Sequence, residues 1–255
     1  MRKRLWRDIA YIPQSAMNAL DPVWRVGKQV EEVLVDRGGL SRKAARMRAE
    51  ELFAMVGLEA KRLRDFPHQF SGGMRQRASI ALALALSPKL VIADEPVTAL
   101  DVIIQRQVLD TFAELQKRLN LSVVLVTHDI SVVAYVCDHV VVMYAGKVVE
   151  AGPVAEVLAS PSHPYTMGLY NAFPELSGED RDLSPIEGSP PDLLNPPKGC
   201  RFRVRCPFAQ PICAEEPPEH IVGDGHRALC HRATEAPNLR VAARQTKTWI
   251  GVTAE

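Results

Sequence analysis

Two stretches of the sequence decide the fold: Phe70-Ser71-Gly72-Gly73-Met74-Arg75-Gln76-Arg77 and, further along the chain, Leu90-Val91-Ile92-Ala93-Asp94-Glu95. The first predicts a helix whose start carries no bulky side chain. Unpaired N–H groups and the helix dipole favour an anion such as a phosphate at that start. The second predicts a short apolar strand ending in two carboxylates, one suited to a magnesium ion and one to a water molecule. Together the two stretches predict a nucleotide site.

The segments around these stretches alternate between helix and strand patterns. Such alternation is typical of an α/β fold with a parallel sheet. The strand at 90–93 is apolar throughout, which favours coverage on both of its faces. The expected helices span 41–58, 71–86, 102–119 and 130–136, and the expected strands span 90–93, 122–126 and 139–143, with a turn at 144–147.

Three further motifs are spaced around this pattern. Ala99-Leu100-Asp101 follows the acidic strand, Thr127-His128-Asp129 closes the next strand, and Gln14 precedes the first helix. In this order, residues 1 to about 155 resemble the ATP-binding cassette (ABC) family of transporter ATPases. The resemblance implies an α/β, P-loop NTPase-like ABC nucleotide-binding domain, here with an incomplete parallel sheet and a helical subdomain at about 18–86. It also implies ATP and Mg²⁺ as ligands.

The resemblance assigns chemical roles to four residues. Asp94 would hold magnesium through a water, and Glu95 would polarise the water that attacks ATP. His128 would contact the γ-phosphate and that water. Gln14 would sense magnesium and couple the site to a transmembrane partner.

The same resemblance places the serine-glycine motif at an ATP held by another subunit. Ser71, Gly72 and Gly73, together with Gln76, would bind the γ-phosphate of that ATP. Asp101 would lie at the seam between the two ATPase subunits. The resemblance therefore implies that the sites form between two subunits, in a homodimer or a heterodimer.

The 255 residues contain no G-x-x-x-x-G-K-[ST] loop, which would hold the phosphates of a nucleotide bound by this chain itself. In the resembled family this loop (Walker A) lies upstream of Gln14. We therefore expect the sequence to be a fragment or a late-started gene model, and the isolated chain to be inactive. The alternative is a catalytically silent partner that donates Ser71–Gly73 to a complete paralogue.

The last third of the sequence narrows the family. His163-Pro164-Tyr165-Thr166 and Gly199-Cys200-Arg201-Phe202 resemble the peptide and nickel importer branch, as does Tyr11–Pro22. This branch implies ATP-driven uptake of dipeptides or oligopeptides at the cytoplasmic face of the membrane. The implied partners are transmembrane permease subunits, a second ATPase subunit and, indirectly, an extracytoplasmic peptide-binding protein.

Four cysteines form a cluster in the sequence: Cys200, Cys206, Cys213 and Cys230. In a protein expected in the cytoplasm, such a cluster favours a metal over disulfides. Four thiolates suit zinc or a 4Fe-4S cluster, and the spacing C-x5-C-x6-C-x16-C lacks the short pairs typical of zinc. The resemblance to the peptide branch points the same way, to a structural 4Fe-4S cluster. Zinc and unligated thiols remain alternatives.

The composition shows two different parts of the chain. We expect the partial ATPase domain at 1–160 and, at 161–255, a small loop-rich extension that contains the cysteines and lacks a large apolar core. The net charge is +1, with 31 Lys and Arg against 30 Asp and Glu, so no global field favours nucleic acid. The sequence also shows no heptad arms or basic groove, which argues against a DNA-repair ATPase.

Overall fold

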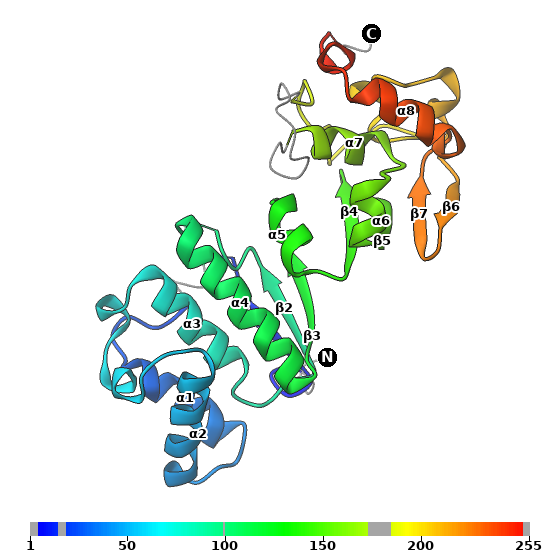
Figure 1. The fold of residues 1–255 in the computed structure, drawn as a ribbon. Helices are drawn as coiled ribbons and strands as arrows, with labels where there is room; N and C mark the ends of the chain where they lie inside the picture. The colour runs from blue at the N-terminus through cyan, green and yellow to red at the C-terminus, as the bar shows by residue number, and fades with distance from the viewer. Residues whose placement is uncertain (1–4, 15–18, 99, 173–184, 252–255) are drawn as a thin grey trace. The chain divides into compact units, whose positions relative to one another are not determined.

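A computed structural model describes residues 5–14, 19–98, 100–172 and 185–251. Ser15–Asn18 and Ala99, which form part of the predicted motifs and of the start of the predicted helical subdomain, lie outside the described residues. The chain divides into two compact units, Met1–His128 and Asp129–Glu255, called here the first and the second unit (Figure 1).

In its described residues, the first unit contains three strands and four α-helices. They are β1 (Ile9–Ile12), α1 (Val26–Asp36), α2 (Arg42–Met55), α3 (Gly72–Ala83), β2 (Leu90–Asp94), α4 (Val102–Leu119) and β3 (Ser122–Val126), with 3-10 turns at Ala60–Arg64 and Pro67–Gln69. The strands form a parallel sheet in the order β1-β2-β3. Tyr11 lies opposite Ile92, and Asp94 lies opposite Val126. The carboxyl ends of all three strands therefore meet at one edge, as the predicted parallel sheet requires.

One face of this sheet is buried and the other is partly open. Val91 and Ala93 of β2 are at most 1% exposed. In the same unit, α3 packs against α4 (Figure 1). On the opposite face Val124 and Val126 of β3 are each 49% exposed. Along β2 itself the burial alternates between buried and half-buried, so this strand is fully covered on one face and partly covered on the other.

The second unit contains an antiparallel sheet in the order β4-β5-β7-β6. Its elements are α5 (Ile130–Val136), β4 (His139–Tyr144), β5 (Lys147–Pro153), α6 (Val154–Ala159), α7 (Pro164–Asn171), β6 (Glu219–Gly223), β7 (His226–Leu229) and α8 (Ala236–Ala243). The strand predicted at 139–143 as part of the alternation is β4, which pairs with β5 through the predicted turn rather than with the parallel sheet.

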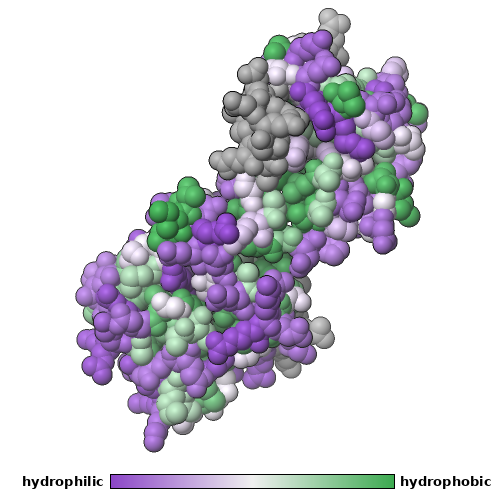
Figure 2. Space-filling model, in the orientation of Figure 1, coloured by the Kyte–Doolittle hydropathy of each residue, from purple (hydrophilic) through white to green (hydrophobic). Residues whose placement is uncertain are grey.

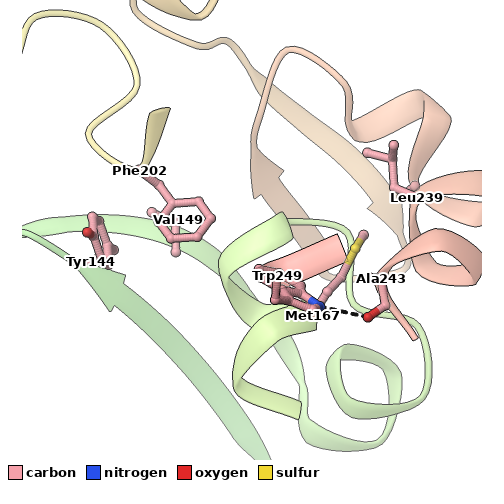
Figure 3. Close-up of a cluster of buried hydrophobic side chains, with 8 residues drawn as sticks. Tyr144, Val149, Met167, Phe202, Leu239, Ala243 and Trp249 are labelled. Atoms are coloured by element: carbon pink, nitrogen blue, oxygen red, sulfur yellow. Dashed lines mark hydrogen bonds between the residues drawn. The ribbon is translucent and has the colours of Figure 1, made fainter. Parts of the chain in front are cut away.

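The second unit has an apolar core of its own (Figure 3). The buried side chains come from the hairpin, from α7 and from the C-terminal elements: Tyr144, Val149, Met167, Phe202, Ala236, Leu239, Ala243 and Trp249. The indole of Trp249 donates a hydrogen bond to the carbonyl of Ala243 at 2.7 Å. The expectation of a C-terminal part without a large apolar core is therefore wrong. The prolines obscured the pattern, because the core side chains come from several short elements, of which only α8 contributes more than one.

The pairing of β5 with β7 explains why the units divide before β4. Glu150 and Ala151 lie opposite Ala228 and Arg227, so the hairpin belongs to the same sheet as the C-terminal strands. The sequence predicts a boundary later in the chain, near residue 160, between the ATPase domain and the cysteine-containing extension. That division into functional domains stays a prediction.

On the visible surface, hydrophobic side chains are scattered among hydrophilic ones (Figure 2). Among the described helices, none combines the length and the apolar character needed to cross a bilayer.

Candidate active site

Residues from the ends of all three parallel strands meet at Glu95. Its carboxylate accepts a hydrogen bond from Gln14 Nε2 at 3.0 Å and one from Thr98 Oγ1 at 3.0 Å. The other oxygen lies 3.0 Å from His128 Nδ1. Gln14 follows β1, Glu95 follows β2 and His128 follows β3, so the sheet itself assembles the group. We call these four residues the Glu95 cluster.

The backbone at Glu95 is held in an unusual conformation. Its φ is +44°, a left-handed conformation that is costly for a residue with a Cβ. The N–H of Glu95 donates to the carbonyl of Val126 at 2.8 Å, which continues the pairing of β2 with β3 by one residue. The strained turn is thus fixed by the sheet, and it directs the carboxylate toward Gln14 and His128.

The surroundings of Glu95 favour its ionised form. The hydrogen bonds from His128 and then from Thr98 lower the pKa of Glu95 below its usual value, with a further contribution from Gln14. The Glu95 side chain is 21% exposed and that of His128 is 75% exposed, so both can be reached from solvent. An ionised, accessible carboxylate next to an imidazole is an arrangement that can accept a proton from a water molecule.

Asp94 has a different partner. Its Oδ2 accepts a hydrogen bond at 2.9 Å from the hydroxyl of Tyr11, which lies on β1. Tyr11 is 53% exposed. The adjacent carboxylates Asp94 and Glu95 therefore contact separate groups of side chains, which suits two separate tasks.

The predicted phosphate-binding motif forms the start of α3. Ser71 caps this helix, because its Oγ accepts a hydrogen bond from the N–H of Met74 at 3.3 Å. A Cβ on Gly73 would lie 2.4 Å from Cγ2 of Ile104, so the close packing of α3 on α4 requires glycine there. Asp101 caps α4 in the same way, accepting from the N–H of Ile104 at 3.0 Å. Gly73 and Asp101 thus belong to neighbouring helix starts.

Gln76 differs from the rest of the motif, since it is only 3% exposed. Its Nε2 is buried and has no hydrogen-bond partner among the described residues. Among those residues, the hydrogen bonds to Glu95 include none from the motif at α3. The fold therefore brings Gln14, Glu95 and His128 together, and Ser71–Gly73 forms a second group.

Sequence reasoning missed Thr98 and Tyr11 as site residues. Thr98 lies three residues after Glu95, a spacing that lets its hydroxyl return to the carboxylate within one turn. Tyr11 lies between buried Ala10 and Ile12 on β1, and no signal in the sequence alone marks it as a partner of Asp94.

The four clustered cysteines line one small cavity in the second unit. All four are free thiols. N–H groups approach two of the sulfurs: Gln210 N lies 3.5 Å from Cys213 Sγ, and Arg232 N lies 3.4 Å from Cys230 Sγ. Burial raises the pKa of Cys200 and of Cys206, and it raises the pKa of Cys230 to about 11.

As they are placed, these thiols do not form a site for a single metal ion. Within the part of the chain that the structure describes, no three His, Cys, Asp or Glu side chains are grouped so that they could hold one. Four cysteine sulfurs around one cavity are nevertheless suitable ligands for a metal cluster, which is larger than a single ion.

Comparison with known proteins decides the family. The ABC transporter family model matches residues 1–98, and the model of the oligopeptide/dipeptide transporter C-terminal region matches residues 149–213. The dipeptide transport ATP-binding protein DppD of Bacillus subtilis is 47% identical over 88% of this chain and 68% of its own length. This chain belongs to the ABC transporter ATP-binding proteins. Within them it matches the oligopeptide/dipeptide branch.

Other ABC relatives agree. The oligopeptide transport ATP-binding protein OppD of Bacillus subtilis is 51% identical over 86% of this chain and 63% of its own length. OppD of Salmonella typhimurium is 45% identical over 89% of this chain and 69% of its own length. The chain thus spans about two thirds of the length of these curated relatives.

Solved ABC structures confirm the fold. A dimer of the ATP-binding cassette MJ0796 in a post-hydrolysis state, bound to ADP and Pi, has a TM-score of 0.51 and 32% identity, covering 58% of this chain and 64% of its own. The protein cbiO1 of Clostridium perfringens, part of the ABC transporter complex cbiONQ, has a TM-score of 0.54 and 30% identity, covering 62% of this chain and 60% of its own. The ABC family model reaches the acidic pair but ends before His128, so the position of His128 beside Glu95 is an observation of the structure alone.

Proposed function

We propose that this chain is the ATP-hydrolysing subunit of an importer that takes up dipeptides or oligopeptides. The observation that carries the proposal is the Glu95 cluster, in which an ionised and accessible carboxylate lies within hydrogen-bond distance of Gln14, Thr98 and His128. The relatives are named as oligopeptide and dipeptide transport ATP-binding proteins, and these names support dipeptides or oligopeptides as the substrate class.

In this proposal the residues of the Glu95 cluster divide the work. Glu95 accepts a proton from the water that attacks the γ-phosphate, and His128 holds that water and the γ-phosphate in place. Gln14 reports the state of the site to the permease through the segment that follows it. Glu95 is suited to this part because its carboxylate is ionised, as a base must be, and accessible, although the lowered pKa makes it a weaker base.

Asp94 would contribute to holding Mg²⁺ through a bound water. Its carboxylate lies at the carboxyl end of β2, where oxygen ligands suit this hard cation. Magnesium would neutralise charge on the phosphates as the bond to the γ-phosphate breaks.

The motif at α3 would serve an ATP held mainly by a second ATPase subunit. The open start of α3, with its glycines, supports contact with a phosphate by Ser71, Gly72 and Gly73. Asp101, at the neighbouring start of α4, would lie at the seam. Gln76 would act through the packing of α3 rather than by direct contact, since its side chain is buried.

The proposed partners are two transmembrane permease subunits and the second ATPase subunit, with a peptide-binding protein acting indirectly. The chain would work at the cytoplasmic face of the membrane, and the helical region from residue 19 to Phe53 would contact the permease. The expected domains, 1–160 and 161–255, would separate ATP hydrolysis from the cysteine-containing extension.

A second candidate function rests on one observation, the absence of a G-x-x-x-x-G-K-[ST] loop within these 255 residues. A chain working without that loop would be a silent partner that donates Ser71–Gly73 to a complete paralogue. Equilibrium dialysis with labelled ATP distinguishes the two candidate functions. The assembled transporter binds two ATP molecules if this subunit completes a site of its own, and it binds one if the subunit is silent. The 255-residue chain alone is expected to show no ATP hydrolysis in either case.

For the cysteine cavity we propose a structural 4Fe-4S cluster held by Cys200, Cys206, Cys213 and Cys230. The convergence of four cysteines on one cavity supports it, as do the N–H groups near two sulfurs. A bound cluster would tie the loop of Cys200–Cys213 to the segment after β7. Protein purified without oxygen should be brown, and Cys206→Ser should remove the colour. Colourless wild-type protein that contains one zinc per chain would show that the cysteines bind zinc instead of an iron-sulfur cluster. Colourless protein without metal would show that the four thiols bind no metal.

The experiment that tests the main proposal uses the transporter assembled with this subunit in proteoliposomes. Uptake of a labelled dipeptide or oligopeptide and ATP hydrolysis are measured together. Both activities should fall to background with Glu95→Gln, while ATP binding persists. The matched control is Glu219→Gln, an exposed carboxylate of the second unit, which should leave both activities unchanged. Uptake that continues with Glu95→Gln would refute the proposal.

A further inference from the structure

The contact between Tyr11 and Asp94 has no counterpart in the roles assigned above. The hydroxyl of Tyr11 donates to Oδ2 of Asp94 at 2.9 Å. Tyr11 lies opposite Ile92 in the parallel register, and Asp94 is two residues beyond Ile92. Since side chains two apart share a face of a sheet, Tyr11 and Asp94 project from the same face. The backbone geometry thus brings the phenol to the carboxylate.

Stability alone does not account for this contact. Tyr11 is 53% exposed, so water competes for both the hydroxyl and the carboxylate, and such a surface contact contributes little to folding. The contact instead sets the direction of the Asp94 carboxylate, because the hydroxyl lies within hydrogen-bond distance of Oδ2.

We propose that Tyr11 is a positioning residue for Asp94: its hydroxyl holds Oδ2 and leaves Oδ1 free for the water bound to Mg²⁺. The inference rests on the proposed function, in which Asp94 serves the magnesium ion. A carboxylate can accept several hydrogen bonds, so the tyrosine and a metal-bound water can share it without competing for one oxygen. Fixing the rotation of the carboxylate before the ion arrives reduces the cost of ordering it on binding.

Loss of the Tyr11 hydroxyl should change the Mg²⁺ dependence of ATP hydrolysis and should leave ATP binding and the chemical step nearly unchanged. Tyr11→Phe removes only the hydroxyl. The Mg²⁺ concentration that gives half-maximal ATP hydrolysis should rise about threefold to tenfold, as expected for one lost hydrogen bond to a charged group in a solvated position. At saturating Mg²⁺, the maximal rate and the KM for ATP should change less than about twofold, because Glu95 and His128 are untouched.

The experiment measures ATP hydrolysis by the assembled transporter over a series of Mg²⁺ concentrations at fixed free ATP. In parallel, electron paramagnetic resonance measures the affinity of the ATP-bound transporter for Mn²⁺ as a probe of the magnesium site, which should fall by the same factor in the Tyr11 variants. Tyr11→Phe and Tyr11→Leu are compared with Tyr165→Phe, which removes a hydroxyl from the aromatic cluster of the second unit. Circular dichroism melts check that each variant is folded. A shift in the Mg²⁺ dependence with both Tyr11 variants, and none with Tyr165→Phe, is the expected result.

Three other results overturn the inference. If Tyr11→Phe leaves the Mg²⁺ dependence unchanged while Glu95→Gln abolishes turnover, the positioning role fails and the proposed function stands. If only Tyr11→Leu shifts the dependence, the ring and not the hydroxyl is responsible. If Glu95→Gln retains turnover, the roles proposed for the acidic pair fail, and the inference about Tyr11 fails with them.

Discussion

Two glutamates in this chain each have three hydrogen-bond partners, one of them a histidine side chain, yet their surroundings are opposite. Glu95, in the first unit, contacts Gln14, Thr98 and His128, and its side chain is 21% exposed. Glu150, in the second unit, accepts from the N–H groups of Ser162 and His163 at 2.7 and 3.0 Å and lies 2.7 Å from His226 Nε2. The Glu150 side chain is fully buried.

The difference shows how exposure separates a chemical role from a structural one. The partners of Glu150 include two backbone N–H groups, and they join β5, β7 and the start of α7 around a carboxylate that no solute can reach. The partners of Glu95 are side chains that water or a ligand can displace. A carboxylate with three partners therefore fixes the fold in one unit and remains available for chemistry in the other.

The largest effect that the comparison predicts is on stability at Glu150. Glu150→Ala leaves two N–H groups and an imidazole buried without an acceptor, so the free energy of unfolding should fall by about 3–5 kcal/mol. Hydrogen exchange of the β5 and β7 amides measures this loss within the second unit. The control Glu219→Ala removes an exposed carboxylate 3.6 Å from Arg227 and should cost less than about 1 kcal/mol. Equal effects of the two substitutions would break the comparison.

The next prediction concerns the pH dependence of stability, which should reflect His163, one of the residues that donate a hydrogen bond to the buried Glu150. Burial lowers the pKa of His163 to about 3 from its ordinary 6.5, so the folded protein keeps it neutral. Below pH 6.5 the unfolded chain binds a proton that the folded chain does not. Stability should therefore fall as the pH is lowered from about 6.5 toward 3, by up to about 1.4 kcal/mol per pH unit.

The variant His163→Asn isolates this contribution. Asparagine retains an acceptor for the N–H of Tyr165, which His163 Nδ1 caps at 3.0 Å, but does not titrate. Urea unfolding at several pH values should show a shallower dependence than in the wild type. His139→Asn, at an exposed histidine, should leave the dependence unchanged. A wild-type slope in His163→Asn would show that other groups cause the acid sensitivity.

A smaller effect is expected from the backbone at Glu95. Because φ is +44°, glycine fits this position better than any residue with a Cβ, so Glu95→Gly should be more stable than Glu95→Ala by about 1 kcal/mol. Elsewhere glycine is usually the less stable of the two. Thermal melts of the pair measure the difference, and neither variant should hydrolyse ATP. If alanine proves the more stable, the conformation at Glu95 is not strained.

The smallest effect is expected from Thr98. Thr98→Val keeps the shape of the side chain and removes the hydroxyl that donates to Glu95, so ATP turnover should fall about twofold to tenfold. Thr98→Ser should restore most of the activity, because it returns the donor. Steady-state ATP hydrolysis by the assembled transporter measures both. Equal losses in the valine and serine variants would point to packing instead of the hydrogen bond.

The sequence predicted the parts of the molecule whose cause is local. The apolar run before Asp94 and Glu95 predicted β2, and Ser71 predicted the start of α3, because strand pattern and capping depend on neighbouring residues. Parallel pairing then brought Gln14 and His128 to Glu95, while the catalytic roles of these residues stay predictions.

What the sequence did not predict depends on contacts between distant segments. Glu150 and His226 are far apart in the chain, and nothing local marks their meeting in the buried network. Trp249 packs in a core assembled from short elements, and among them only α8 contributes more than one side chain, so the pattern in each segment is weak. The contact of Tyr11 with Asp94 requires the register between β1 and β2, which only the fold supplies.

The most direct test of the difference between the two glutamates is the rate of phosphate release from ATP already bound to the assembled transporter. Starting from bound ATP separates the chemical step from binding. Replacing Glu95 by Gln should slow this release by roughly 10²- to 10⁴-fold, with the amount of bound ATP unchanged, because the group that accepts the proton is lost. Release at close to the wild-type rate would contradict the account.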